Sequence, residues 1–241
     1  MNPPQGNPFQ GCQGAELIWQ SWQALAAQLD YLSPNIRDTL LKTTIYAARA
    51  HDGQMRKADG APYITHPLAV AKILAQLHYG ATVLQGALLH DVLEDTEISS
   101  AEMAKAISPE VTYIVQGVSK IQKIKESDPK RNQAGSFLNM LEALIQDPRV
   151  LLVKLADRLH NLQTLDAFPP EKQKRIARET VEVYVHLSQQ LGMFYFASQL
   201  EDLAFQYLYP WRAKIIKHHY EKNFANDQLV REIDGELQRA F

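Results

Sequence analysis

Apolar residues recur at intervals of three and four along most of the chain, which is the period of an amphipathic α-helix. The first such run consists of Trp19, Trp22, Leu25, Ala26 and Leu29. A second helix is predicted to begin at Ser33-Pro34, because serine caps helix ends and proline is tolerated in the first turn. Runs of alternating β-branched residues are absent. The pattern therefore predicts an all-α fold of about ten to twelve helices.

The same period predicts further helices, separated by Gly, Pro and polar breaks. We expect them at about 65–77, 83–95, 108–118, 137–145, 150–165 and 171–191, followed by roughly two or three more. Ser99 and Glu102 have the spacing of a capping box and predict one additional short helix.

The helical pattern divides the chain into three expected regions. Residues 1–14 contain three Pro, three Gly and no Lys or Arg, so we expect a disordered tail. Residues 15–209 carry the helical period and are expected to form one domain. Residues 210–241 are more polar and are expected to form a C-terminal helical extension.

Composition narrows the class of protein. The chain has 241 residues, with 25 basic and 27 acidic side chains and a formal net charge of −2. This balance excludes a strongly basic nucleic-acid binder. No uninterrupted apolar run of about 18 residues is present, so no membrane span is predicted. The single cysteine, Cys12, excludes an internal disulfide and suits a reducing compartment. We therefore expect a cytoplasmic protein that binds neither nucleic acid nor membrane.

The densest group of ionisable residues is His90-Asp91 with Glu94-Asp95, at the end of a strongly apolar helix. Burying that many ionisable groups without a partner costs several kcal/mol, and a bound cation would remove this cost. Imidazole and carboxylate ligands suit Zn, Mn or Fe better than Mg or Ca. The alternative is an ordinary helix end with solvated acids.

Two more positions are candidates for the same chemistry. His66 stands at a predicted helix start after a Gly- and Pro-containing loop, where it is either a ligand or a capping or packing residue. Asp157 shares the polar side of a helix with Lys154, Arg158 and Asn161. That side is either functional or a solvated face with an internal ion pair, and spacing does not decide between these.

Several motifs together resemble the HD hydrolase domain of the RelA/SpoT alarmone enzymes. They are Tyr63–Pro67, Leu88–Val92 followed by Glu94–Thr96, and Val153–Asn161. The similarity extends in order from about Leu40 to about Tyr209, so we expect residues 15–209 to be this HD hydrolase domain.

The resemblance implies an α-helical domain that holds one Mn²⁺ and hydrolyses the 3′-pyrophosphate of ppGpp and pppGpp, giving GDP or GTP and pyrophosphate. Its metal-ligand positions are His66, His90, Asp91 and Asp157. Its catalytic acidic pair corresponds to Glu94 and Asp95. Its nucleotide-binding positions correspond to Arg56, Lys57, Asn161 and Thr164. Lys154 and Arg158 are further candidates for offsetting phosphate charge.

Some residues depart from the family pattern and keep other hypotheses open. Basic residues are usual where this chain has Gln163, Gln189 and Gln190. This loss of charge motivates a second hypothesis, a weakly active regulatory module that binds alarmones. A third hypothesis is a phosphohydrolase of another nucleotide, such as NADPH. The synthetase half of the long enzymes is absent, which fits either a stand-alone small hydrolase or a shortened bifunctional enzyme. The oligomeric state is left open.

Overall fold

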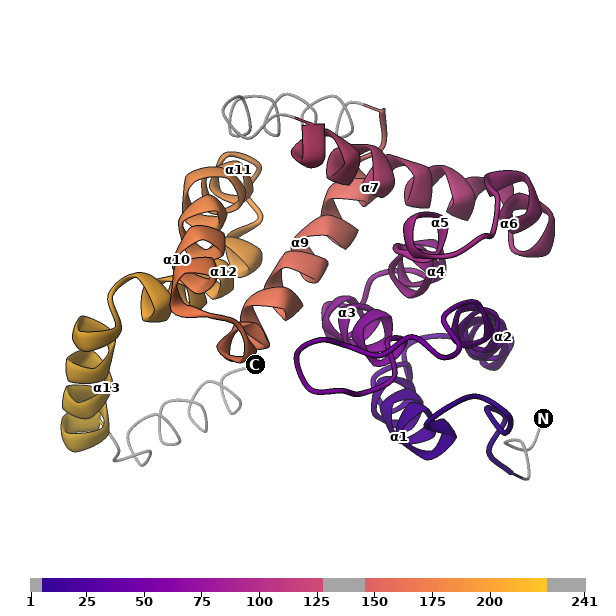
Figure 1. The fold of residues 1–241 in the computed structure, drawn as a ribbon, viewed down its shortest axis with the longest axis horizontal. Coiled ribbons are helices and arrows are strands. Elements are labelled where there is room, and N and C mark those ends of the chain that lie inside the picture. Colours follow the sequence, from indigo (N-terminus) through magenta and orange to yellow (C-terminus); the bar gives the residue numbers. More distant parts are fainter. Residues whose placement is uncertain (1–5, 128–145, 225–241) are drawn as a thin grey trace, which may run out of the picture.

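The protein is described by a computed structural model over residues 6–127 and 146–224, and these residues form an all-α fold without a β-strand, as predicted (Figure 1). The predicted helix at 137–145 lies outside the described residues. The α-helices are α1 (Ala15–Ala26), α2 (Pro34–Ala50), α3 (Thr65–Gln76), α4 (Ala81–Leu89), α5 (Val92–Asp95), α6 (Ser100–Ala106), α7 (Pro109–Ser127), α9 (Pro148–Gln163), α10 (Pro170–Glu179), α11 (His186–Gln190), α12 (Phe194–Leu208) and α13 (Pro210–Phe224). A 3-10 turn, η1 (Leu165–Ala167), and a π-helix, η2 (Thr180–Val185), complete the set.

Helix α9 lies at the centre of the molecule and joins its two sides (Figure 1). It packs against α3, α4 and α7 on one side and against α12 on the other. Leu155, Leu159 and Leu162 are buried with at most 1% of each residue exposed. These leucines anchor the helix in the core, while Lys154, Asp157 and Arg158 of the same helix line a cavity described below.

Local capping residues set several helix boundaries. The capping box at α6 is confirmed, because the Ser99 side chain accepts from the backbone N–H of Glu102 while the Glu102 carboxylate accepts from that of Ser99. Asp147 caps α9 by accepting from the backbone N–H of Arg149, and Pro148 occupies the first turn. Asp147 and Pro148 fix the residue at which α9 begins, and the start of the helix in turn determines which of its residues face the centre.

The helix predicted over 83–95 is divided into α4 and α5. The α4 helix ends at Leu89, and α5 begins at Val92. His90 and Asp91 occupy the break and are both buried. A continuous helix would separate consecutive side chains by about 100° around its axis. The break instead lets two adjacent polar side chains turn into the same interior space.

The helix predicted over 171–191 is interrupted by the π-helix η2, which lies between α10 and α11. A π-helical segment adds a residue to the turn and changes which side chains face inward. Tyr184, within η2, is fully buried.

The N-terminal tail expected to be disordered is ordered over residues 6–14, so that expectation is wrong for this part. Phe9 is 1% exposed and packs near Trp19, with ring centroids 6.3 Å apart. Asn7 donates to the carbonyl of Ala15, and the backbone N–H of Gln13 donates to Asp52. Burial of the aromatic ring outweighs the turn-forming composition. Residues 1–5 lie outside the described residues.

At the other end, α13 begins at Pro210, where we expect the C-terminal extension to begin. The division into regions stays a prediction. Among the helices of residues 6–127 and 146–224, none combines the length and apolar character that a membrane span requires.

Candidate metal centre

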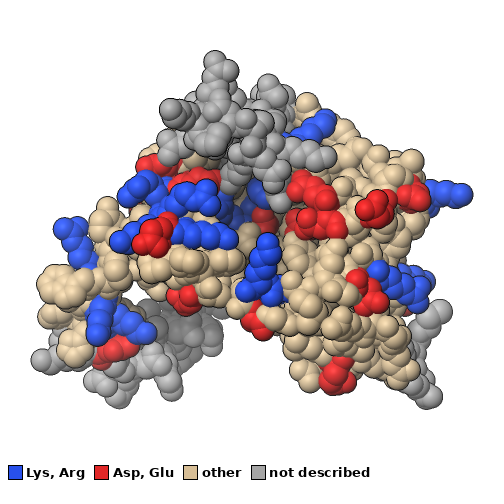
Figure 2. Space-filling model, viewed as in Figure 1, with Lys and Arg blue, Asp and Glu red and all other residues tan. Residues whose placement is uncertain are grey.

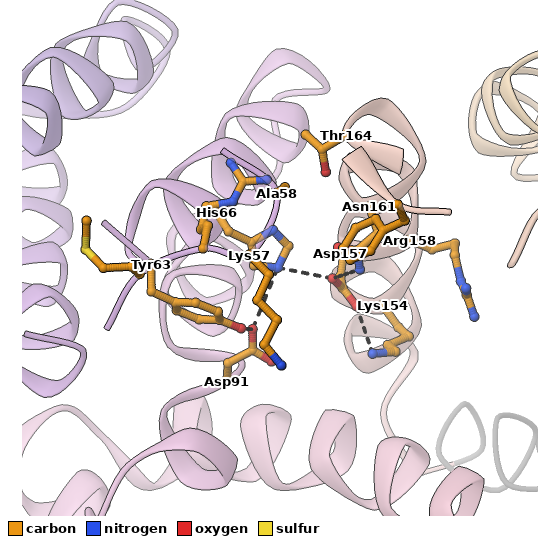
Figure 3. Close-up of a pocket in the computed structure, with 13 residues that line it drawn as sticks. Lys57, Ala58, Tyr63, His66, Asp91, Lys154, Asp157, Arg158, Asn161 and Thr164 are labelled. Atoms are coloured by element: carbon orange, nitrogen blue, oxygen red, sulfur yellow. Dashed lines mark hydrogen bonds and ion pairs between the residues drawn. The ribbon is translucent and has the colours of Figure 1, made fainter. Parts of the chain in front are cut away.

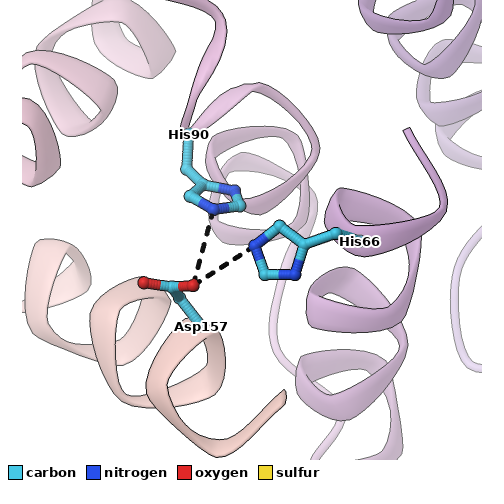
Figure 4. Close-up of side chains that lie close together, drawn as sticks. All are labelled: His66, His90 and Asp157. Atoms are coloured by element: carbon cyan, nitrogen blue, oxygen red, sulfur yellow. Dashed lines mark ion pairs between the residues drawn. The ribbon is translucent and has the colours of Figure 1, made fainter. Parts of the chain in front are cut away.

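Three residues distant in sequence bring ligand atoms together in the interior (Figure 4). His66 comes from α3, His90 follows α4, and Asp157 comes from α9. Their ligand atoms all lie within 4.8 Å of one another, and all three residues are buried. His66 Nε2 is 3.2 Å from Asp157 Oδ1, and His90 Nε2 is 3.8 Å from the same oxygen.

Asp91 adds a fourth ligand atom to this group. Its Oδ2 is 2.9 Å from His90 Nε2 and 3.7 Å from His66 Nε2, and the residue is 4% exposed. The break between α4 and α5 is what allows the adjacent His90 and Asp91 to reach one point. His66, His90 and Asp157 therefore form one compact group, and Asp91 borders it through its contacts with both imidazoles.

Each carboxylate of this group is held by a hydrogen bond from a neighbouring side chain. Tyr63 donates its hydroxyl to Asp91 Oδ2 at 2.6 Å. Lys154 donates to Asp157 Oδ2 at 2.8 Å, and Asn161 donates to Asp157 Oδ1 at 2.7 Å. Such contacts orient ligating side chains in metal sites.

The two imidazoles are held through their Nδ1 atoms. His90 Nδ1 is 2.8 Å from the carbonyl oxygen of Ala87, which can only accept, so His90 carries a proton on Nδ1. His66 Nδ1 is 2.7 Å from Nδ1 of His160. Both Nε2 atoms therefore point toward the carboxylates.

The donor set and its burial fit a divalent cation. His90 Nε2 is buried, and its nearest charged neighbour among the described residues is Asp91 Oδ2 at 2.9 Å, outside hydrogen-bond geometry. Two imidazoles and two carboxylates match the ligands of transition metals such as Mn, Fe or Zn. Together the four groups place two negative charges around one small volume, which a divalent ion neutralises.

The protonation equilibria of the site also favour positive charge there. Burial lowers the pKa of His90, but attraction to Asp91 and Asp157 outweighs this and raises the pKa to about 9. Burial raises the pKa of Asp157, but the nearby ammonium of Lys154 and the hydrogen bond to His66 hold it well below its usual range. A metal ion would replace the imidazole proton as the source of positive charge.

A cavity of about 470 Å³ opens beside the four residues (Figure 3). All six residues predicted to bind substrate line it: Arg56, Lys57, Lys154, Arg158, Asn161 and Thr164. His66, Asp91 and Asp157 form part of its wall, and Met55, Ala58 and Phe168 add apolar surface. The cavity therefore joins the candidate metal ligands to a wall of cationic side chains.

Lys154, Asp157 and Arg158 on α9 are at most 7% exposed, so these three side chains are not part of a solvated face, whereas Asn161 is exposed. Arg158 donates to Glu179 at 2.7 Å, and its guanidinium lies 4.2 Å from the ring centroid of Tyr184. Figure 3 shows Arg158 directed away from Asp157.

The predicted acidic pair lies beside the cavity and outside its lining. Glu94 is half-buried on α5, and burial together with the charge of Asp91 raises its pKa. The Oε1 atom of Glu94 is buried without a hydrogen-bond partner among the described residues. Asp95 has an exposed side chain, and its backbone carbonyl accepts from Gln54 at 2.6 Å.

Sequence reasoning missed three residues that the structure places around the site: Tyr63, His160 and Phe168. Tyr63 and His160 stand inside the motifs that carry the family resemblance, so the motifs offered a signal. Phe168 borders a Pro-rich turn and had no signal from spacing.

An all-helical domain in which His and Asp side chains from separate helices meet in the interior defines the class of HD-type domains. Residues 43–194 match the HD domain family, and the chain belongs to that family.

The chain is also similar to alarmone enzymes. It is 43% identical over 215 residues to the bifunctional (p)ppGpp synthase/hydrolase SpoT of Escherichia coli K12, covering 87% of this chain and 30% of that protein. It is 41% identical over 214 residues to the guanosine-3′,5′-bis(diphosphate) 3′-pyrophosphohydrolase of Vibrio cholerae, with the same coverage. The chain thus spans about 30% of the length of these curated relatives.

A solved structure shares the fold. It is described as "A metazoan ortholog of SpoT hydrolyzes ppGpp and plays a role in starvation responses". The TM-score is 0.58 at 28% sequence identity, and the match covers 70% of this chain and 94% of that one.

Proposed function

We propose that this protein is a Mn²⁺-dependent hydrolase that removes the 3′-pyrophosphate of (p)ppGpp to give GDP or GTP and pyrophosphate. The observation that carries the proposal is the cavity in which His66, Asp91 and Asp157 adjoin a wall of cationic side chains. Relatives named for this hydrolysis match 80–87% of the chain, which supports the same assignment.

The proposed ligands of the ion are His66, His90, Asp91 and Asp157. A divalent ion held there lowers the pKa of a bound water and stabilises charge on a phosphoryl oxygen. Two imidazoles with two carboxylates suit Mn²⁺ as they suit Fe²⁺ or Zn²⁺, and the choice of Mn²⁺ among them rests on the motif resemblance to the RelA/SpoT hydrolase domain.

The cationic residues are assigned to the phosphate groups. Lys57 and Arg56 come from the loop before α3, which a bridge between Met55 and Pro62 closes. Arg56 pairs with Asp59 at 3.2 Å, and this contact fixes the guanidinium at the cavity wall. Phosphoryl transfer depends mainly on such positioning and charge stabilisation.

The remaining predicted residues receive separate roles. Asn161 and Thr164, one helical turn apart at the end of α9, are assigned to the guanosine. Lys154 stays charged, because attraction to Asp157 raises its pKa against the effect of burial, and it holds the Asp157 carboxylate in place. Glu94 and Asp95 are assigned to orienting and deprotonating the attacking water. Burial and the charge of Asp91 move the pKa of Glu94 upward, toward neutral pH. A general base is most effective when its pKa lies near the working pH.

The proposal is tested by incubating the purified protein with ppGpp and Mn²⁺ and identifying the products. We expect GDP and pyrophosphate in equal amounts, and no turnover by Asp91→Asn. A folded, Mn²⁺-loaded sample that releases no pyrophosphate contradicts the proposal. The same assay with NADPH and other phosphorylated nucleotides tests the alternative substrates.

The structure gives the binding-only hypothesis little support. Gln163, Gln189 and Gln190, which replace basic residues of the family pattern, are exposed and do not line the cavity. The charge lost at these positions therefore leaves the proposed site intact. Cytoplasmic location stays a prediction.

A further inference from the structure

His66 contacts its surroundings through both ring nitrogens. Nε2 faces the carboxylates, 3.2 Å from Asp157 Oδ1 and 3.7 Å from Asp91 Oδ2. Nδ1, on the opposite edge of the ring, lies 2.7 Å from Nδ1 of His160. Both histidines are buried, with exposed fractions of 6% and 7%. The two imidazoles therefore contact each other directly. Which of them donates the hydrogen bond determines whether His66 Nε2 can bind a cation.

A nitrogen-to-nitrogen distance of 2.7 Å requires one donor and one acceptor. Two N–H groups would repel each other, and two lone pairs would share no proton. A histidine that binds a cation through Nε2 must keep a lone pair there, so its proton resides on Nδ1. His66 is then the donor, His160 Nδ1 is the acceptor, and the proton of neutral His160 resides on Nε2.

The opposite direction has a different consequence. If His160 donates to His66, the proton of neutral His66 moves to Nε2 and faces Asp157. His66 would then form an ordinary hydrogen-bonded pair with a carboxylate and would have no lone pair for a metal ion. The direction of the hydrogen bond between His66 and His160 therefore distinguishes two chemically distinct states of the same site.

The other histidine of the site shows how such selection is achieved. His90 is held by the carbonyl of Ala87, one turn earlier on its own helix. His66 has no hydrogen bond from Nδ1 to a backbone carbonyl among the described contacts, and an imidazole takes that place. His160 follows Asp157 by three residues on α9, so one helix carries both a candidate ligand and the group that orients another.

We propose that His160 is a positioning residue that accepts the Nδ1 proton of His66 and thereby keeps His66 Nε2 free to bind the cation. The proposal rests on the metal site of the proposed function and is independent of the substrate. It assigns to His160 no contact with the reacting atoms.

The test compares two variants at this position by Mn²⁺ binding without nucleotide, followed by electron paramagnetic resonance. His160→Phe keeps the ring volume and removes the acceptor, and we expect Mn²⁺ affinity to fall by about 10–100-fold. His160→Asn places an amide oxygen near the position of Nδ1, and we expect affinity within about threefold of wild type. Unchanged affinity in a folded His160→Phe protein, or an equal loss in both variants, overturns the proposal.

Nitrogen-15 NMR of the Zn²⁺-loaded wild-type protein provides a test that needs no variant. We expect a slowly exchanging proton on His66 Nδ1 and a proton on Nε2 of His160. A proton on His160 Nδ1 overturns the proposal. If wild type binds Mn²⁺ as described but does not cleave ppGpp, the proposed function fails while this inference stands, so the two failures are distinguishable.

Discussion

At the scale of single residues, the ion pair between Lys154 and Asp157 links the site to the stability of the fold. Both side chains are 7% exposed, and the pair closes at 2.8 Å. Breaking a buried pair by removing one partner is much more costly than replacing both, because the remaining charge stays desolvated.

We predict that Asp157→Asn destabilises the metal-free protein by about 3 kcal/mol and abolishes Mn²⁺ binding. The double variant Lys154→Met/Asp157→Leu should recover most of the stability and none of the binding. Urea unfolding with EDTA, together with Mn²⁺ titration, measures both effects. Equal stabilities of wild type and Asp157→Asn would show that the pair does not bear on folding.

His51 provides a prediction about pH. It is buried, and burial lowers its pKa below the ordinary value of 6.5 despite the hydrogen bond to Gln54. The unfolded chain therefore binds a proton more readily than the native protein near pH 6. The contribution of neutral His51 to stability is present above pH 6.5 and is lost as the pH falls below it.

We accordingly expect wild type to lose more unfolding free energy between pH 8 and pH 5.5 than His51→Asn does. Urea titrations of both proteins at the two pH values, in EDTA, give the comparison. Parallel losses in the two proteins would mean that His51 titrates as freely in the native state as in the unfolded one.

At the scale of helices, α7 and α9 approach each other closely at Gly117 and Val150. A Cβ atom at Gly117 would lie 2.6 Å from Val150 Cγ2, closer than carbon atoms tolerate. Val150 is 1% exposed and stiff at its branched Cβ, so it has little room to shift.

We predict that Gly117→Ala destabilises the protein by about 1–3 kcal/mol, as overpacked cores do. Adding Val150→Ala should return part of this loss by removing the clashing methyl groups. Thermal unfolding of the two variants tests the packing. If Val150→Ala only adds to the damage, the clash is not the cause.

The helices themselves were predictable from sequence, because apolar spacing records which face is buried. The capping box of Ser99 and Glu102 was also predictable, because it depends on two residues that are close in sequence. The break at His90-Asp91 was not, because it serves contacts with α3 and α9 that no local pattern encodes. The segment around Phe9 was predicted wrongly. Its local composition favours turns and indicated disorder, but burial of the Phe9 ring holds the segment in place.

For the candidate site, the residues were predictable but some of their contacts were not. Motif resemblance singled out His66, His90, Asp91 and Asp157, and the fold brings all four together. Resemblance did not show that Arg158 pairs with Glu179 and lies over the Tyr184 ring, or that His66 is hydrogen-bonded to His160. Both depend on side-chain direction, and the contact of Arg158 with Tyr184 also depends on the π-helix, which spacing alone does not determine.

At the scale of the whole molecule, α9 forms the seam between the two sides (Figure 1). It carries Lys154, Asp157 and Arg158 of the cavity lining. Figure 2 shows Lys and Arg side chains gathered over the region of α10, which includes the exposed Lys174, Arg175 and Arg178. Such a surface raises the local concentration of anionic ligands although the net charge of the chain is only −2.

Because the proposed ligands come from α3, the α4–α5 break and α9, ion binding should stabilise the whole domain. Mn²⁺ at a hundred times its Kd is expected to add about 2.7 kcal/mol to the unfolding free energy. For a chain of this size, this corresponds to about 5–10 °C in Tm. Differential scanning calorimetry with and without Mn²⁺ measures the shift, and Asp91→Asn should show none. An equal shift in that variant would place the ion elsewhere.

In the proposed site, four side chains from three parts of the chain share one divalent ion. A crystal structure of the Mn²⁺-loaded protein, with anomalous diffraction collected at the manganese edge, shows directly where the ion lies. We expect a single strong peak bonded to His66 Nε2, His90 Nε2 and carboxylate oxygens of Asp91 and Asp157. A peak bound by other residues, or no peak between these four in a Mn²⁺-saturated crystal, would contradict it.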